Sequence, residues 1–407
     1  MKRIAMLLLL GFILLPLYSF DFFAEQASRT ISFNLESGVT LYRDKQFQQQ
    51  ADLSFAGEYN EERYRALAAL TYDSAQNSLK ATELSISLFF GEQTLKAGLF
   101  THPWGSATTS HVVDVLQGRD LRRGLVDDLE RMKRPTYMAL FTSYGESSSL
   151  ELVLKPGFTP SYLPTEGRYN LIPAGFASAT FTEMDTHTLS SFEVGSRYRI
   201  CLGSLDTGVL YYNGHYHEPG FTVTSLAPLS VDLTYTRYQL FGLETSLLMD
   251  SFTLALEGGF FLSEDSKGDD SGLYNSKIAY LAELSYTNPT NSAFVSVAYQ
   301  GRYVFDFSTS ASDVDYLASY DGKAYENTFI FVVEYPIMQE KLKARGALTY
   351  QAESEGYALL LGLSYALHDN LQVFGKATIY GALGDKSSLY KSWDTNDGVT
   401  IGMQAWF

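Results

Sequence analysis

Cysteine and positive charge are both scarce in this sequence. Cys201 is the only cysteine among 407 residues, which excludes an intrachain disulfide and any metal site built from several cysteines. Charged residues make up only 19% of the chain, below the ~25% typical of soluble domains. Thirty Lys and Arg against 46 Asp and Glu give a formal net charge of −16. Such a chain lacks the concentrated basic surface that binding to nucleic acid requires, so we expect no nucleic-acid partner.

Long apolar runs are also missing after residue 24, so no transmembrane helix of about 18 residues is predicted. The one apolar run, residues 4–17, follows Lys2 and Arg3 at the N-terminus. A basic start followed by a short apolar stretch is typical of a secretory signal peptide. We therefore predict a signal peptide at residues 1–24 and a single exported domain at residues 25–407.

Aromatic residues, in contrast, are abundant, with 29 Tyr and 27 Phe, and they belong to a repeated alternation of apolar and polar positions. A strict period of two indicates β-strands with one apolar face. About 18 such segments follow one another: residues 31–41, 51–59, 64–72, 84–90, 95–99, 137–141, 150–154, 192–200, 207–211, 235–243, 252–262, 278–286, 293–299, 329–335, 342–350, 357–365, 371–379 and 399–407. The count falls to 16 if a weak segment is a loop.

The gaps between these segments alternate between short and long. Residues 60–62, 91–93 and 145–147 are short gaps, whereas residues 101–134 and 155–187 are long ones. Outer-membrane barrels have short periplasmic turns and long external loops, and an even strand count returns both termini to the periplasm. The fold class predicted is therefore all-β, a transmembrane antiparallel β-barrel in the outer membrane of a Gram-negative-type envelope.

The last strand supports this fold. It ends at the C-terminus on Trp406 and Phe407, with no charge on its apolar face. On a soluble sheet such an edge would promote aggregation, whereas in a closed barrel it has a partner on both sides. A terminal Phe also resembles the C-terminal signal of outer-membrane barrels, so Trp406 and Phe407 are the predicted contact with the barrel assembly machinery.

Charged residues in the strands mostly share the parity of the small polar residues. An Arg facing lipid at mid-bilayer would cost about 2–4 kcal/mol, so these side chains should point into a lumen. The candidates are Arg65, Glu83, Lys96, Glu193, Arg197, Arg199, Glu257, Glu283, Arg345 and Lys376. Parity slips near residues 241–242, because Arg237 and Glu244 fall on opposite faces, and we attribute this slip to a β-bulge.

Residues 101–134 lack the period of two and contain the one concentrated basic cluster of the chain. A charged loop that follows an early strand can fold into the lumen, narrow it and focus the electric field on a passing solute. The predicted constriction residues are Arg119, Arg122, Arg123, Asp114 and Asp120. The alternative is an external loop whose charges satisfy one another.

Part of this region resembles a known family. The residues that carry the resemblance are Gly98, Trp104-Gly105, Arg119-Asp120, Pro135, and the loop containing Pro156, Pro160, Pro164 and Gly167. They are similar to the "W-G" signature region of a family of porin-like bacterial outer-membrane proteins, over about residues 95–170. Many members of that family have an Asn-Pro in the Asp-rich part, which this chain lacks. The resemblance implies a porin-like barrel and supplies no catalytic residue.

Other candidate sites are weaker. The loop at residues 155–187 is rich in Pro and aromatics, and it either caps the pore or packs on itself. His215 and His217 have no third ligand, so no metal site and no cofactor are predicted. Cys201 lies in a predicted short turn, where we interpret it as a bystander.

The sequence thus predicts a non-enzymatic, porin-like channel that passes small solutes across the outer membrane, in contact with its lipids. The net charge of −16 suggests a preference for cations, tempered by the basic loop. Porins commonly form trimers, so a homotrimer is one candidate, but no segment indicates an interface and the sequence leaves the oligomeric state open. The alternatives are a structural or adhesive surface barrel with a closed lumen, and a lipid-modifying enzyme embedded in a barrel. An enzyme of that kind needs Ser and His together on the lipid face, and none of the six His lies clearly at such a position.

Overall fold

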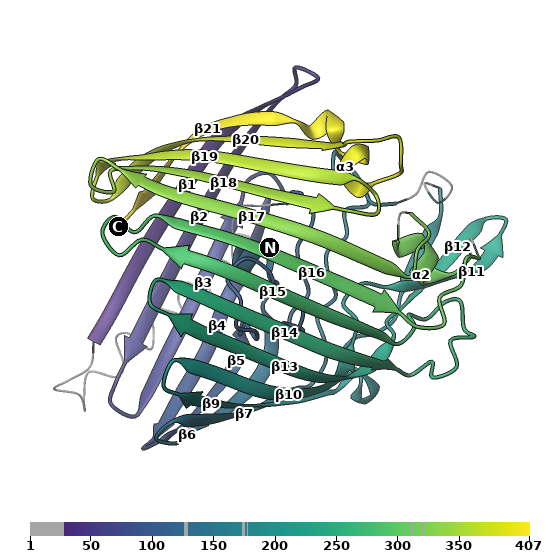
Figure 1. The fold of residues 1–407 in the computed structure, drawn as a ribbon, viewed down its shortest axis with the longest axis horizontal. Coiled ribbons are helices and arrows are strands. Elements are labelled where there is room, and N and C mark those ends of the chain that lie inside the picture. Colours follow the sequence, from purple (N-terminus) through teal and green to yellow (C-terminus); the bar gives the residue numbers. More distant parts are fainter. Residues whose placement is uncertain (1–27, 126–128, 173–175, 177, 311, 320) are drawn as a thin grey trace, which may run out of the picture.

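A computed structural model describes residues 28–125, 129–172, 176, 178–310, 312–319 and 321–407. Eighteen antiparallel strands form one closed sheet, in which β1 pairs with both β2 and β21 (Figure 1). The barrel strands are β1 (Ser28–Tyr42), β2 (Phe47–Asn60), β3 (Tyr64–Asp73), β4 (Ser78–Phe90), β5 (Gln93–Phe100), β6 (Thr136–Tyr144), β7 (Ser148–Lys155), β9 (Glu193–Leu202), β10 (Leu205–His215), β13 (Arg237–Met249), β14 (Phe252–Ser263), β15 (Lys277–Thr287), β16 (Phe294–Val304), β17 (Tyr325–Ile337), β18 (Leu342–Gln351), β19 (Gly356–His368), β20 (Leu371–Ala382) and β21 (Gly398–Trp406). The predicted barrel is confirmed, and each of the 18 predicted segments overlaps one of these strands.

The period of two explains why these segments pair as they do. In β1 the odd positions Ile31, Phe33 and Leu35 point outward with exposed fractions of 47%, 45% and 39%, whereas Asn34 and Glu36 point inward. Exposed apolar side chains recur at every second position around the barrel. In water this belt would be costly at about 25 cal/mol per Å², but in a bilayer it contacts lipid. The belt therefore accounts for both the closure of the sheet and its membrane location.

The two ends of the barrel differ in their connections. One end has only short turns and also holds the C-terminus, at the left in Figure 1. The other end, which is the outer one by the rule for these barrels, carries the long loops. Three of its connections are nevertheless short hairpins, at residues 43–46, 74–77 and 352–355.

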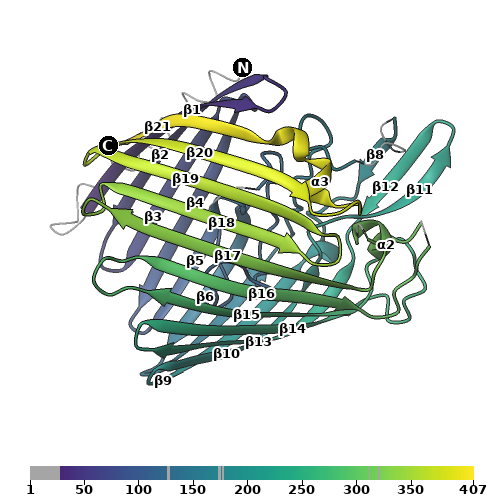
Figure 2. The same ribbon diagram turned by 45° about the horizontal axis from the view of Figure 1, so that its top comes forward.

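The long loops contain some regular structure of their own. β8 (Thr180–Glu183), β11 (Gly220–Leu226) and β12 (Leu229–Thr234) form a small sheet that projects from the outer end (Figure 2). Short helices also lie in these loops: η1 (Leu129–Met132), η3 (Leu189–Ser191), α2 (Val314–Ala318), α3 (Leu389–Ser392) and η4 (Asp394–Asn396). Among the described residues, no helix is both long and apolar enough to cross a membrane.

The expected bulge near residues 241–242 is wrong. β13 pairs with β10 and β14 in continuous register, so Arg237 and Glu244 do lie on opposite faces. Arg237 is the first residue of β13, at its outer end, where its guanidinium bonds Asn213 and the carbonyl oxygen of Phe192. An outward Arg is tolerated there because it lies at the end of the strand and its donors are satisfied. The predicted signal peptide lies outside the described residues.

Candidate functional site

The connection between β5 and β6, residues 101–135, folds into the barrel and packs against its inner wall. Trp104 is fully buried, and its indole meets the ring of Tyr212 edge to face, with centroids 6.2 Å apart. Apolar residues of the loop and of the facing strands form one continuous core. Its members are Phe100, Trp104, Val112, Val113, Val115, Leu116, Met138, Leu140, Val153, Leu210, Tyr212, Tyr216, Tyr238, Leu240, Phe261 and Leu281. The lumen beside β6–β15 is therefore filled by a hydrophobic core.

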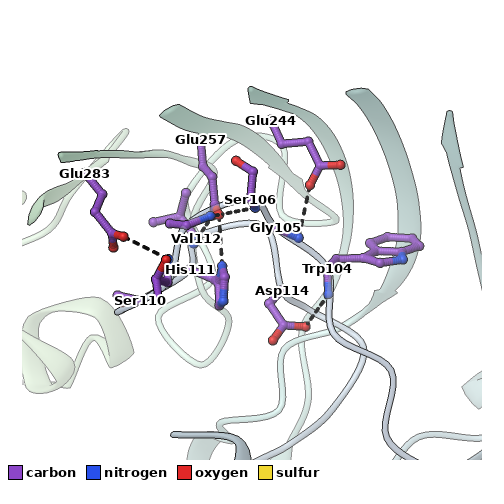
Figure 3. Close-up of polar contacts among 12 residues, drawn as sticks. Trp104, Gly105, Ser106, Ser110, His111, Val112, Asp114, Glu244, Glu257 and Glu283 are labelled. Atoms are coloured by element: carbon purple, nitrogen blue, oxygen red, sulfur yellow. Dashed lines mark hydrogen bonds and ion pairs between the residues drawn. The ribbon is translucent and has the colours of Figure 1, made fainter. Parts of the chain in front are cut away.

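Glu257 of β14 is the central anchor of this inserted loop (Figure 3). Its Oε1 accepts hydrogen bonds from the backbone N–H groups of Ser106 and Ala107, at 2.8 and 3.0 Å. Its Oε2 accepts one from the N–H of Val112 at 2.9 Å, and the Nδ1 of His111 lies 2.9 Å from Oε1. A single buried carboxylate thus satisfies three backbone donors that would otherwise be unpaired inside the barrel.

Two neighbouring strands extend the same arrangement. Glu244 of β13, which pairs directly with Glu257 in the sheet, accepts the N–H of Gly105 at 3.0 Å. Glu283 of β15 accepts the N–H groups of Thr108 and Thr109, at 3.0 and 2.9 Å. The three glutamates hold the loop at successive points along the barrel wall.

The Trp104-Gly105 pair has a physical explanation in this geometry. The backbone N–H of Trp104 bonds Asp114 at 3.1 Å, and its indole N–H bonds Glu151 at 3.0 Å. Gly105 has φ +114, and a Cβ there would lie 2.3 Å from the Nδ1 of His111. No other residue fits this position, because both the backbone conformation and the space exclude a side chain.

His111 makes the anchoring dependent on pH. Burial lowers the pKa of His111, but the hydrogen bond and charge of Glu257 outweigh it and hold this pKa above its ordinary value. The stabilisation is therefore complete below the unfolded pKa, about 6.5, and is lost as pH rises through the folded pKa. We expect His111→Gln to lower the free energy of unfolding most at pH 6 and progressively less towards pH 9, in urea titrations of the detergent-solubilised barrel. A difference that stays constant across this range would contradict the expectation.

The structure separates the predicted constriction residues into two groups. Asp120, Arg122 and Arg123 line a large cavity, whereas Asp114 and Arg119 line a smaller one on the other side of the loop. Arg122 pairs with Asp120, with its Nε 2.8 Å from Oδ1. The role of these five residues in constricting a pore stays a prediction.

Arg123 bridges the loop to the barrel wall. Its Nη1 lies 2.7 Å from Asp52 of β2, and its Nη2 lies 2.7 Å from Asp73 of β3. Lys80 of β4 adds contacts to both Asp73 and Asp120. Sequence reasoning missed Asp52 and Asp73, although the inward parity of β2 and β3 was a signal that could have indicated them.

The charged residues predicted to face the lumen lie on the inward parity of their strands. Most form ion pairs: Arg65 with Glu58, Lys96 with Glu83, Arg197 with Glu244 and Glu151, Arg199 with Asp206 and Glu244, and Arg345 with Glu334. Lys376 lines the large cavity. Glu193 forms a fully buried pair with Lys155, a partner that the sequence reasoning did not single out.

The large cavity has a volume of about 1190 Å³ and lies on the side of the barrel that the loop leaves open. Strands β1–β5 and β18–β21 form its wall. It extends from Gln46, in the outer hairpin between β1 and β2, to Asn34, which pairs with Trp406 near the end of β21. All three short outer hairpins join strands of this wall, whereas long loops cover the filled side.

The proline-rich loop after β7 also reaches this cavity. The ring centroid of Tyr162 lies 4.0 Å from the guanidinium carbon of Arg122 and 3.3 Å from that of Arg134. Arg168 bonds Asp44 of the first outer hairpin at 2.8 Å. The loop therefore crosses the outer mouth and contacts the opposite wall, so it does not pack only on itself.

The two histidines considered as metal ligands, His215 and His217, lie buried inside the barrel. The residues that the structure describes contain no cluster of three or more His, Cys, Asp or Glu that could hold a metal ion. His215 contacts Glu193, and His217 contacts the carbonyl oxygens of Val115 and Thr159, all inside the barrel. Burial lowers the pKa of His217 below its ordinary value.

The C-terminal pair completes the closure. The backbone N–H of Trp406 bonds the carbonyl of Asn370, and Phe407 exchanges two hydrogen bonds with Phe33. Both side chains are exposed. The role of Trp406 and Phe407 as an assembly signal stays a prediction.

No family model and no curated protein matches the sequence, so the "W-G" resemblance stays an expectation. Solved structures do match. Pseudomonas aeruginosa OccK11 (OpdR) is similar at 11% identity and a TM-score of 0.54, over 95% of this chain and 97% of that one. OccK3 (OpdO) of the same organism is similar at 12% identity and a TM-score of 0.54, over 93% and 96%. Wzi, an outer-membrane protein involved in group 1 capsule assembly in Escherichia coli, is similar at 13% identity and a TM-score of 0.51, over 91% and 83%. By its fold and its apolar belt, the chain is a porin-like β-barrel of the outer membrane.

Proposed function

We propose that the protein is a passive channel that admits small solutes through the large cavity and prefers anions. The observation that carries this proposal is the cavity itself, which runs beside the inserted loop from the outer hairpins towards the periplasmic half. The loop occupies one side of the lumen and leaves a narrowed path on the other. A narrow path with low-dielectric walls focuses the field of the charges that line it.

The lining of this path is more basic than the chain as a whole. Nine Lys and Arg face five Asp and Glu there: Lys80, Arg122, Arg123, Arg131, Lys133, Arg134, Arg168, Arg345 and Lys376 against Glu36, Asp52, Asp73, Asp120 and Glu166. The formal excess among the described lining residues is thus four positive charges. A positive path attracts anions and repels cations.

Four of the five acidic residues of the path are paired with cations of the same lining. Arg123 contacts both Asp52 and Asp73, and Arg131 contacts Glu36. Burial raises the pKa of Asp120, but the hydrogen bond and charge of Arg122, with the charge of Lys80, hold it below its ordinary value. Its carboxylate is therefore ionised and already paired at neutral pH.

This proposal reverses the cation preference that the net charge suggested. Net charge counts the whole surface, and much of the acidity lies in outer loops, such as Asp265, Asp269 and Asp270 in the connection before β15. Charges beyond a Debye length of about 8 Å act weakly on a solute in the path. The charges of the lining lie nearest to the solute and therefore act on it most strongly.

Replacing Arg123 tests the proposal. Arg123→Met removes one positive charge and leaves Asp52 and Asp73 without their guanidinium partner. We expect the anion-to-cation permeability ratio to fall towards one, measured as the reversal potential of single channels in a salt gradient, because the positive excess of the lining decreases from four to three. The matched control is Arg119→Met, which removes the same charge from the same loop but outside the large cavity. It should leave the ratio unchanged.

The two alternatives give different results. A structural or adhesive barrel with a closed lumen would show no conductance as wild type and none after deletion of residues 106–131. A cation-selective wild-type channel would support passage but overturn the anion preference. A lipid-modifying enzyme would release acyl chains from vesicles, which we do not expect because His102, His111, His215 and His217 contact residues inside the barrel and do not lie on its lipid face.

A further inference from the structure

A short segment of the connection between β7 and β9, residues 163–167, lies across the outer mouth of the large cavity. We call this segment the bar, and all of its residues line the cavity. Thr165, Glu166 and Gly167 are exposed, and a Cβ at Gly167 would have no other atom within 4 Å. This part of the bar is therefore not held by packing of its own, and its position depends on the attachment of the two ends.

The first end of the bar is attached to the inserted loop. Tyr162, which precedes the bar, forms a parallel β-bridge with Asp120 of the loop. The N–H of Tyr162 donates to the carbonyl oxygen of Arg119 at 2.7 Å, and its own carbonyl oxygen accepts the N–H of Leu121 at 3.0 Å. The guanidinium carbon of Arg122 also lies 4.0 Å from the centroid of the Tyr162 ring. Backbone hydrogen bonds and a cation–π contact thus fix this end.

The second end of the bar is attached to the opposite wall by Arg168. Its Nη2 donates to Asp44 at 2.8 Å and to the side chain of Gln46 at 2.8 Å, both in the hairpin between β1 and β2. Its guanidinium carbon lies 3.9 Å from the ring centroid of Tyr42, and its carbonyl oxygen accepts the side-chain amide of Asn396 at 2.8 Å. The Asp44 side chain is 39% exposed, and an ion pair in contact with water contributes little stability by itself.

Tyr169 makes the stronger attachment at this second end. Its ring packs edge to face on Trp393 and Tyr380, with centroids 5.2 and 6.3 Å apart. Trp393 and Tyr380 are each only 2% exposed. Gly124 of the inserted loop, with φ +70, leaves room for the Tyr169 ring, because a Cβ there would overlap it. Packing among aromatic rings is favourable and is not screened by salt, so it keeps the bar in place when the exposed ion pair is weakened.

We propose that the bar sets the size limit of the channel, and that Tyr169 is the positioning residue that holds the bar across the mouth. Because both ends are attached, the bar does not swing aside, and a solute has to pass beside it. Compact solutes of one sugar ring then enter more easily than chains of three rings. The proposal rests on the proposed channel function, although the position of the bar can be tested without passage.

Swelling of liposomes that contain the protein tests the size limit, with glucose and raffinose as neutral probes that respond to size and not to charge. In Tyr169→Ala, whose fold is first checked by heat-sensitive gel mobility, we expect the ratio of the raffinose rate to the glucose rate to rise at least about fivefold. Tyr169→Phe keeps the ring, and Glu166→Gln alters the bar without touching either attachment, so both should keep the wild-type ratio. A purely structural role of Tyr169 would lower stability and leave the ratio unchanged, which would overturn the proposal.

Cysteine labelling in intact cells distinguishes failure of the bar from failure of the channel. Ser54 of β2 lines the large cavity, and Cys201→Ser removes the exposed native cysteine. In the Ser54→Cys, Cys201→Ser protein, N-ethylmaleimide should react equally fast with and without Tyr169→Ala. A maleimide on a short polyethylene glycol chain, added outside, should react at least about tenfold faster with Tyr169→Ala. Equal rates for this bulky reagent would overturn the bar even in a conducting channel. Faster labelling of a barrel that passes no glucose would overturn the channel function and support the bar.

Discussion

Glu257→Leu is expected to release the inserted loop from the barrel wall. The substitution leaves the N–H groups of Ser106, Ala107 and Val112 and the ring of His111 without their acceptor. Removing one partner from such a buried charged network costs about 3–5 kcal/mol. We expect the free energy of unfolding to fall by that order and the single-channel conductance to rise severalfold, because the displaced loop no longer fills its side of the lumen.

The control for this result is Glu257→Gln. The amide keeps the shape and one acceptor oxygen, so part of the anchoring remains and the conductance should stay close to that of the wild type. Deletion of residues 106–131 gives the upper limit of the conductance, since it removes the loop from the lumen. A Glu257→Leu channel with the conductance and stability of the wild type would show that the apolar core alone holds the loop.

Lys155→Met is expected to be the second strongly destabilising change. Lys155 and Glu193 form an ion pair in which both side chains are fully buried. Lys155 also donates to the carbonyl of Leu116 in the inserted loop at 2.8 Å and to the hydroxyl of Tyr212 at 3.1 Å. Removing the lysine leaves the Glu193 carboxylate in the core without its counter-ion. We expect the free energy of unfolding to fall by about 3–5 kcal/mol. Urea unfolding followed by tryptophan fluorescence, to which Trp104 beside Tyr212 contributes, measures this loss of stability.

The double variant separates the charge effect from the packing effect. Lys155→Met with Glu193→Leu replaces the pair by apolar groups of similar volume, which is often neutral for an isolated buried pair. Here the recovery should be partial, because Glu193 also accepts the Tyr212 hydroxyl at 2.5 Å and the N–H of His215 at 2.7 Å. A double variant less stable than Lys155→Met alone would contradict this account.

Much of the fold was predictable from the sequence because it depends on local signals. The alternation of apolar and polar residues in segments such as 31–41 and 399–407 indicates which face of the strand meets lipid. It can be recognised in each strand without reference to the others. Loop lengths likewise report which end of a strand faces outward. Arg237 was the exception. Its place in the alternation predicted a bulge, because the alternation does not show that the strand has already reached its polar outer end.

The assembly of the interior was not predictable in the same way. Glu244, Glu257 and Glu283 come from three separate strands, and they converge on one loop only because the register of β13–β15 brings them to one patch of wall. Arg119 and Arg123 are four residues apart in one basic cluster, yet they line different cavities.

The sequence by itself therefore determined the barrel, its approximate strand number, its outer-membrane location and the inward parity of its charges, because the bilayer imposes a period of two on every strand. Tertiary structure alone decided which side of the lumen is filled, which carboxylates anchor the loop, and which charges line the remaining path. Those features depend on contacts between residues more than 100 positions apart, such as Glu257 with Ser106. No local sequence pattern predicts such contacts, because the residues come together only when the sheet closes into a barrel.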